Sequence, residues 1–157
     1  MHRRTIMHAF LATSVLAALT APVAAQSARD LVGTWTIVSA GDAYGPNAKG
    51  NATFDSNGRF SIILMRATLP KYTSNNRVQG TPAEYKATVE GSLAYFGTYS
   101  LSGTDLNLHI EGSTFPNWTG GDQKRTNVSV TGDEFKYTQP NPSSGGAPAQ
   151  LIWKRAK

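Results

Sequence analysis

The sequence contains no cysteine. This absence excludes a disulfide framework, a cysteine nucleophile and a zinc–thiolate site. Histidine is also scarce: of three in the chain, His2 and His8 lie at the extreme N-terminus and only His109 lies in the remainder. A metal site would need oxygen ligands, and no spacing typical of a calcium-binding loop is present. We therefore expect neither a metal nor a cofactor.

Long apolar runs are equally rare, and the one present predicts a secretory signal. Arg3 and Arg4 precede an apolar stretch from Ile6 to Leu19, and Val23-Ala24-Ala25 is typical of a cleavage site before Gln26. The stretch is too short to span a bilayer and has no stop-transfer flank. We predict a cleaved signal peptide and no stable membrane insertion.

Cleavage would separate a signal peptide at residues 1–25 from one domain at residues 26–157, which is long enough for a single hydrophobic core. Secretion without disulfides is compatible with a bacterial periplasm, so we predict a periplasmic or secreted location. The formal net charge of +5 would fall by two, and the remaining basic residues are scattered from Arg29 to Lys157. No basic run is interleaved with aromatics, so we expect no nucleic-acid partner.

Turn signals at short intervals divide this domain into strands. Asp55–Gly58, Ser102–Asp105 and Thr131–Glu134 each separate two β-rich runs and predict a β-hairpin. Further runs, Leu31–Val38 and Gln150–Arg155, open and close the domain. About eight strands with up-and-down connections suit a closed antiparallel barrel, because closure removes exposed sheet edges. A two-sheet sandwich is the competing architecture.

One segment departs from the strand pattern. Thr81-Pro82-Ala83-Glu84 is a capping box with proline at the first helical position, and it predicts a short helix that ends between Val89 and Leu93. The polar stretch Lys71–Gly80 before it predicts a loop. An insertion of this kind can act as a lid or plug for a barrel mouth.

The densest polar stretch runs from His109 to Arg125. Period-two alternation places His109 and Glu111 on one face of a strand and Leu108 and Ile110 on the other. If the polar face points inward, the imidazole and the carboxylate can serve as a general acid–base pair. If it points to solvent, the leucine face lines the barrel. The alternation leaves both orientations open.

Aromatic residues near this stretch are candidates for apolar ligand contact. Phe115, Asn117 and Trp118 follow the strand, and Tyr95 and Tyr99 share one face of the preceding strand in the hairpin. Large aromatics beside convergent polar groups are what a small-molecule site needs. The alternative is that Phe115 and Trp118 cap the core beneath a loop.

Three arginines are candidates for an anionic group. Arg125 could join Arg66 or Arg77 in binding a carboxylate, with Asp122 as a further polar member of the site. The alternative is that Asp122 and Arg125 are solvated charges at the start of a strand, and that Arg66 extends its head to the surface.

The first strand contains Gly33-Thr34-Trp35, which resembles the Gly-x-Trp opening of the lipocalins. There the tryptophan closes one barrel end and is often covered by an arginine of the last strand, a position that Arg155 matches. Over nearly the whole mature chain the sequence resembles the bacterial lipocalin-like domain family. The matching segments are Leu31–Trp35, Lys49–Phe60, Met65–Arg66, Ser74–Arg77, Ala94–Tyr99, His109–Arg125 and Trp153–Arg155. The resemblance implies an all-β, eight-stranded, up-and-down antiparallel barrel with one short helix and a candidate pocket, but no reaction.

Three functional hypotheses follow. The leading one is a secreted barrel that binds a small, mostly apolar molecule with a polar or anionic end. The second is a cofactor-free isomerase, cyclase or lyase that uses His109 and Glu111 for proton transfer. The third is a packed barrel without a cavity that binds a partner. The sequence predicts no oligomeric state.

Overall fold

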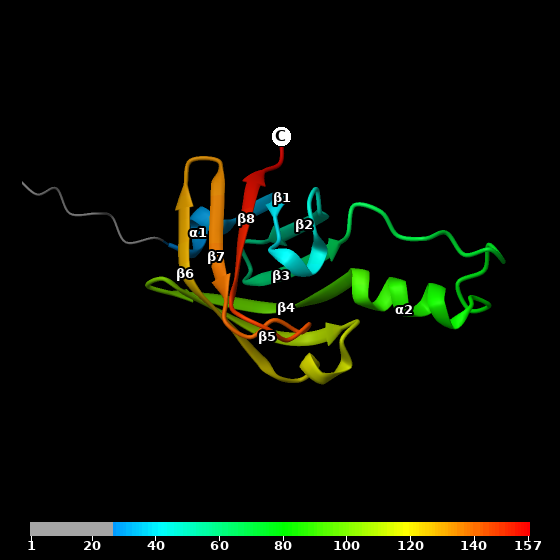
Figure 1. The fold of residues 1–157 in the computed structure, drawn as a ribbon. Helices are drawn as coiled ribbons and strands as arrows, with labels where there is room; N and C mark the ends of the chain where they lie inside the picture. The colour runs from blue at the N-terminus through cyan, green and yellow to red at the C-terminus, as the bar shows by residue number, and fades with distance from the viewer. Residues whose placement is uncertain (1–26) are drawn as a thin grey trace, which may run out of the picture.

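The computed structural model describes residues 27–157, which form a closed antiparallel barrel in which each strand pairs with the next and β8 pairs with β1 (Figure 1). The strands are β1 (Gly33–Ser39), β2 (Lys49–Phe54), β3 (Arg59–Met65), β4 (Ser92–Ser102), β5 (Asp105–Ser113), β6 (Asp122–Thr131), β7 (Glu134–Gln139) and β8 (Ala149–Arg155). Helix α1 (Ala28–Leu31) precedes β1, and helix α2 (Pro82–Gly91) and two 3-10 turns, η1 (Asp42–Tyr44) and η2 (Pro116–Trp118), lie between strands. The predicted barrel is confirmed, and the sandwich is excluded. The predicted signal peptide lies outside the described residues.

All three predicted hairpins are confirmed. They join β2 to β3, β4 to β5 and β6 to β7. In the first of them, the Asp55 carboxylate accepts hydrogen bonds from the backbone N–H groups of Asn57 and Arg59, at 2.9 and 2.8 Å. This side-chain bonding stabilises the turn locally, and Tyr99 of β4 adds a backbone hydrogen bond to the Gly58 carbonyl. Strand β6 begins at Asp122, earlier than the run at Asn127 that marks it in the sequence.

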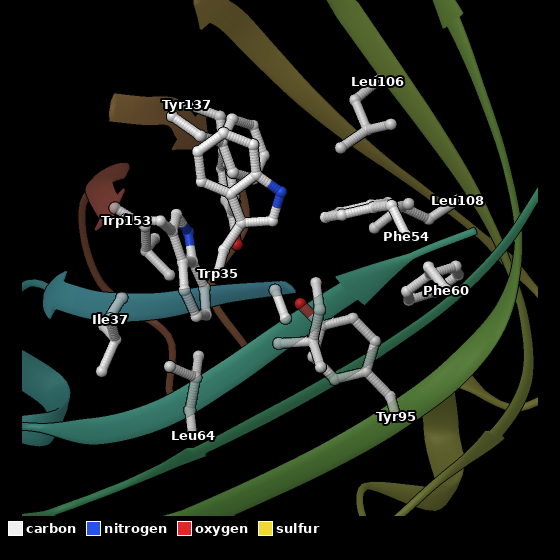
Figure 2. Packing of buried hydrophobic residues seen from close by; sticks show 14 of the residues in the cluster. Trp35, Ile37, Phe54, Phe60, Leu64, Tyr95, Leu106, Leu108, Tyr137 and Trp153 are labelled. Atoms are coloured by element: carbon white, nitrogen blue, oxygen red, sulfur yellow. The ribbon is translucent and has the colours of Figure 1, made fainter. Parts of the chain in front are cut away.

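The barrel interior is filled largely by aromatic and branched side chains (Figure 2). Successive strand residues alternate between inside and outside, so each strand contributes one apolar face. Phe135 lies near the middle of this packing, with ring centroids 5.4 Å from Trp35 and 5.7 Å from Phe54. An eight-stranded barrel is just wide enough for side chains to fill it.

One end of the barrel is closed by Trp35 and Arg155. The Arg155 guanidinium lies 4.1 Å from the Trp35 ring centroid and donates to the carbonyls of Val32 and Asp30. A side chain at Gly33, whose φ is +129°, would meet the Arg155 guanidinium at 2.9 Å, so this close approach requires glycine. The role expected for the Gly-x-Trp motif and Arg155 is therefore confirmed.

Helix α2 and the loop before it project away from the barrel as an arm (Figure 1). The predicted capping box is present: the Glu84 N–H donates to the Thr81 hydroxyl, and the Thr81 N–H donates to the Glu84 carboxylate at 2.7 Å. Glu84 also accepts two hydrogen bonds from Thr73. These bonds, led by the backbone bond from Thr81, lower the pKa of Glu84 to about 2. Between residues 27 and 157, no helix is long and apolar enough to cross a membrane.

Candidate functional site

A cavity of about 40 Å³ lies at the barrel mouth, at the end opposite Trp35. Its walls are mostly apolar or aromatic: Ala40, Ala43, Tyr44, Leu64, Leu93, Tyr95, Trp118, Gln139, Pro142, Ser143, Ser144, Ala149 and Leu151. No residue of the arm lines it, so in this structure the insertion is not the lid that the sequence allowed. The cavity is small beside the ~300–1,000 Å³ of drug-sized ligand pockets.

Arg125 of β6 lies fully buried directly behind two of these wall residues. Its guanidinium carbon is 5.9 Å from the ring centroid of Tyr95, 5.5 Å from that of Trp118 and 6.0 Å from that of Tyr137. It donates to the Lys124 carbonyl at 3.1 Å and to the Tyr95 hydroxyl at 3.4 Å, and its Nε has no partner. The sequence left open a solvated charge or an anion-binding residue at this position, and the burial of Arg125 excludes the solvated charge.

The positive charge of Arg125 has no carboxylate beside it among residues 27–157. The one buried acidic side chain in this part of the chain is Glu84, and its oxygens bond to Thr73 and Thr81 in the arm. Burying a charge costs several kcal/mol, whereas a cation–π contact returns about 0.5–2 kcal/mol. The three rings therefore compensate the charge only in part, and the interior favours an anion at this point.

Two further polar side chains of the interior are buried: Tyr137, whose ring centroid lies 6.0 Å from the Arg125 guanidinium carbon, and Trp153, whose ring centroid lies 6.5 Å from that of Tyr137. The Tyr137 hydroxyl and the Trp153 indole N–H meet no hydrogen-bond partner in the structure. Burial raises the pKa of Tyr137 well above its usual value; the neighbouring Tyr95 hydroxyl raises it further, and the Arg125 charge opposes the shift. Figure 2 shows Tyr95 and Tyr137 extending from opposite walls toward one another. We call Tyr95, Arg125, Tyr137 and Trp153 the interior polar cluster.

A β-bulge in β6 explains how Arg125 reaches the interior. The register with β7 shifts between Thr126 and Ser129, and Asn127 adopts a φ of 53°. The Asn127 amide donates to the Thr138 hydroxyl at 3.3 Å. A bulge inserts an extra residue and changes which side chains face inward beyond it. Arg125 and Val128 are therefore both buried, although they lie three positions apart and regular alternation would place them on opposite faces.

The structure brings three predicted ligand-binding residues together: Tyr95, Trp118 and Arg125. Phe115 supports them from the side, because its half-buried ring packs edge-on against Trp118 with centroids 5.9 Å apart. Trp118 thus packs on the core, which was the alternative to ligand contact in the sequence analysis, and it also lines the cavity. Tyr99 does not join them. Its ring packs against Phe54, and its hydroxyl donates to the Asp55 carbonyl.

Arg66 lies at the rim of the mouth. Its Nε donates to the carbonyl of Ala43, a wall residue, at 3.3 Å. Next to it, burial raises the pKa of Tyr44 to about 12; the Tyr95 hydroxyl adds to the shift and Arg66 opposes it. Arg77 is exposed on the projecting loop and Asn117 is exposed on η2, so neither lines the cavity.

His109 and Glu111 share one strand face, as predicted, and that face points to solvent. His109 Nδ1 lies 2.8 Å from a carboxylate oxygen of Asp122, whose side chain is exposed. Glu111 pairs with Arg59 instead, through two hydrogen bonds that lower the pKa of Glu111 and raise that of Arg59. The two residues therefore bond to different partners, and any proton transfer by them would occur outside the barrel.

A larger hollow of about 440 Å³ lies on this outer surface. It is lined by Thr98, Tyr99, Ser100, Asn107, Leu108, His109, Asp122, Gln123 and Lys124. Its charged side chains already have partners, since His109 pairs with Asp122 and Lys124 pairs with Asp105 at 2.6 Å. The mouth is the better candidate site because buried polar groups behind it are unpaired, and such groups are rare in folded proteins.

Sequence reasoning missed Tyr44, Tyr137 and Trp153 as site residues. The signal for Tyr137 was present, because Phe135, Tyr137 and Gln139 alternate on one face of a short strand. Within the described part of the chain, no three histidine, aspartate or glutamate side chains gather closely enough to hold a metal ion.

Comparison with known proteins identifies the fold family. The model of a family described as the lipocalin-like domain matches residues 32–156. No curated protein matches the chain. Among solved structures, the chain is similar to a lipocalin-like protein from Bacteroides uniformis ATCC 8492, with 18% sequence identity and a TM-score of 0.41 over 81% of this chain and 99% of that one.

Proposed function

This chain belongs to the lipocalin-like domain family, and we propose that its barrel binds a small, mostly apolar molecule with a polar or anionic end at the mouth opposite Trp35. The observation that carries the proposal is Arg125, a buried cation with no carboxylate beside it among residues 27–157, lying directly behind the cavity wall. A ligand with an anionic end would supply the missing charge.

The walls of the mouth support an apolar body for this ligand. Leu64, Leu93 and Leu151 line the cavity together with the rings of Tyr95 and Trp118. Pockets with apolar walls and a few placed polar groups are typical of small-molecule sites. A cavity of about 40 Å³ accepts only a few heavy atoms, so a longer ligand would extend outward past the segment Pro142–Ser144.

The proposal includes a periplasmic or secreted location, which rests on the charged and apolar pattern of residues 1–25. Expression of the full chain in a bacterium, followed by mass measurement of the periplasmic protein, tests it. A mass that begins at Gln26 is expected. Full-length protein retained in the cytoplasm would contradict this part of the proposal.

Binding at the mouth can be tested with 8-anilinonaphthalene-1-sulfonate, which is apolar with one anionic end. We expect saturable one-to-one binding by fluorescence titration. Leu93→Phe, which fills the cavity, is expected to weaken it about tenfold or more. The matched control is His109→Gln, on the outer surface, which should bind like the wild type. Equal affinity in all three proteins, with native circular dichroism, would contradict the proposed site.

A further inference from the structure

We propose that the anionic end is a carboxylate, bound side-on by the Nε and Nη2 groups of Arg125, with the Tyr137 hydroxyl as a neighbouring donor and the Trp153 indole N–H beyond Tyr137. This inference rests on the proposed function, because it names the ligand class for the same mouth. It assigns binding roles to Tyr137 and Trp153, which the sequence did not single out.

The guanidinium has one edge that is available for a ligand. Nη1 donates to the Lys124 carbonyl at 3.1 Å. Nη2 makes only a long bond of 3.4 Å to the Tyr95 hydroxyl, and Nε has no partner. Nε and Nη2 lie side by side on the guanidinium and match the two oxygens of a carboxylate with parallel hydrogen bonds.

The hydrogen-bonding groups of the interior polar cluster favour a carboxylate over other end groups of a ligand. The guanidinium and the Trp153 indole only donate hydrogen bonds, and Tyr137 can donate a third. A ligand cation would be repelled by Arg125. An alcohol offers a single oxygen and adds a donor where donors are already in excess. A carboxylate brings one negative charge to match one positive charge, and it is smaller than a phosphate in a confined space.

Access to Arg125 involves Trp118. The Trp118 ring lies 5.5 Å from the guanidinium carbon and lines the cavity on its other side. It is carried by η2, a single short turn between β5 and β6, with Phe115 packed against it. Charge-assisted hydrogen bonds are stronger than the cation–π contact that a shift of Trp118 would weaken. We therefore expect the Trp118 side chain to move when a carboxylate binds.

Isothermal titration calorimetry with octanoate and octan-1-ol tests this inference, because the two probes share a tail and differ in the end group. The wild type is expected to bind octanoate about tenfold more tightly or better, since charge-assisted bonds are made only with the acid. Arg125→Met should lose this preference and keep its affinity for octan-1-ol. Lys124→Met, at the exposed neighbouring position, should behave like the wild type.

Arg125→Lys provides a second variant in case the methionine protein does not fold. Lysine keeps the positive charge but lacks the pair of N–H groups, Nε and Nη2, that would bind both carboxylate oxygens. Octanoate should therefore bind to this variant about tenfold more weakly than to the wild type. Unchanged octanoate affinity in either folded variant would overturn the inference. Equal binding of the two probes by the wild type would also overturn it but leave the proposed function standing. Failure of both probes and of 8-anilinonaphthalene-1-sulfonate to bind would overturn both.

Discussion

Arg125 and Tyr95 meet inside the barrel, where Nη2 of the arginine lies 3.4 Å from the tyrosine hydroxyl. They come from β6 and β4, on either side of β5. This contact joins a buried charge to a wall residue of the mouth cavity, and no carboxylate elsewhere in residues 27–157 neutralises it. A buried charge without a counter-charge lowers the stability of the folded protein.

Arg125→Met should raise the free energy of unfolding. Methionine has a similar length and no charge to desolvate, and replacing buried charges with apolar residues stabilises some proteins by about 1–4 kcal/mol. Urea denaturation monitored by circular dichroism measures the change. Lys124→Met, which is exposed, should stay within about 0.5 kcal/mol of the wild type. A loss of stability in Arg125→Met would show that Arg125 holds the fold together through its ring contacts.

At the closed end of the barrel, Arg155→Ala should destabilise the protein by about 2–3 kcal/mol. It removes the contact with the Trp35 ring and two hydrogen bonds to backbone carbonyls. Thermal and urea unfolding measure the loss. Lys154→Ala changes an exposed neighbour on the same strand and serves as the control. Equal effects of the two variants would mean that Arg155 contributes nothing as a cover for Trp35.

The bulge at Asn127 should tolerate glycine but not a β-branched residue. Asn127 has a φ of 53°, a conformation that costs an ordinary L-residue about 1–2 kcal/mol. Asn127→Gly should therefore stay close to wild-type stability, and Asn127→Val should lose about that amount. Urea denaturation compares them. If valine were tolerated as well as glycine, the bulge would not constrain this residue.

The arm should loosen in acid before the barrel unfolds. Hydrogen bonds from Thr81 and Thr73 lower the pKa of Glu84 to about 2 in the folded state, against about 4.3 in an unfolded chain. The stabilisation is therefore complete above the unfolded value and is lost as the pH falls from about 4.5 toward 2. Hydrogen exchange of the α2 amides measures this loss. Glu84→Gln should abolish the pH dependence; an unchanged profile would contradict the role of the carboxylate.

Local sequence signals predicted much of the fold. Asp55 and Gly58 mark a turn through their own side-chain and backbone preferences, and Thr81 and Glu84 form their capping box with each other. The contact between Trp35 and Arg155 was predicted from the family motif. The two residues are far apart in the sequence, so no local pattern could have predicted it. These predictions succeeded because each depends on a few neighbouring residues or on a recognisable motif.

The candidate site was harder to predict because its geometry depends on two non-local facts. Alternation places His109 and Glu111 on one face but does not say which face lies inside, and the answer depends on how the whole barrel closes. Arg125 would face outward if β6 alternated regularly from Val128 and Val130, which project toward the core. The bulge at Asn127 reverses this, and its residue type alone does not reveal it.

Nuclear magnetic resonance of the Arg125 Nε–H group tests the central claim most directly. In a protein with nitrogen-15 in its arginine side chains, the Nε–H signal that disappears in Arg125→Lys belongs to this residue. We predict that octanoate shifts this signal downfield in a saturable manner and that octan-1-ol does not, because only the acid forms a charge-assisted bond to Nε. A signal that stays fixed while octanoate binds would contradict the account, because the ligand would then lie elsewhere.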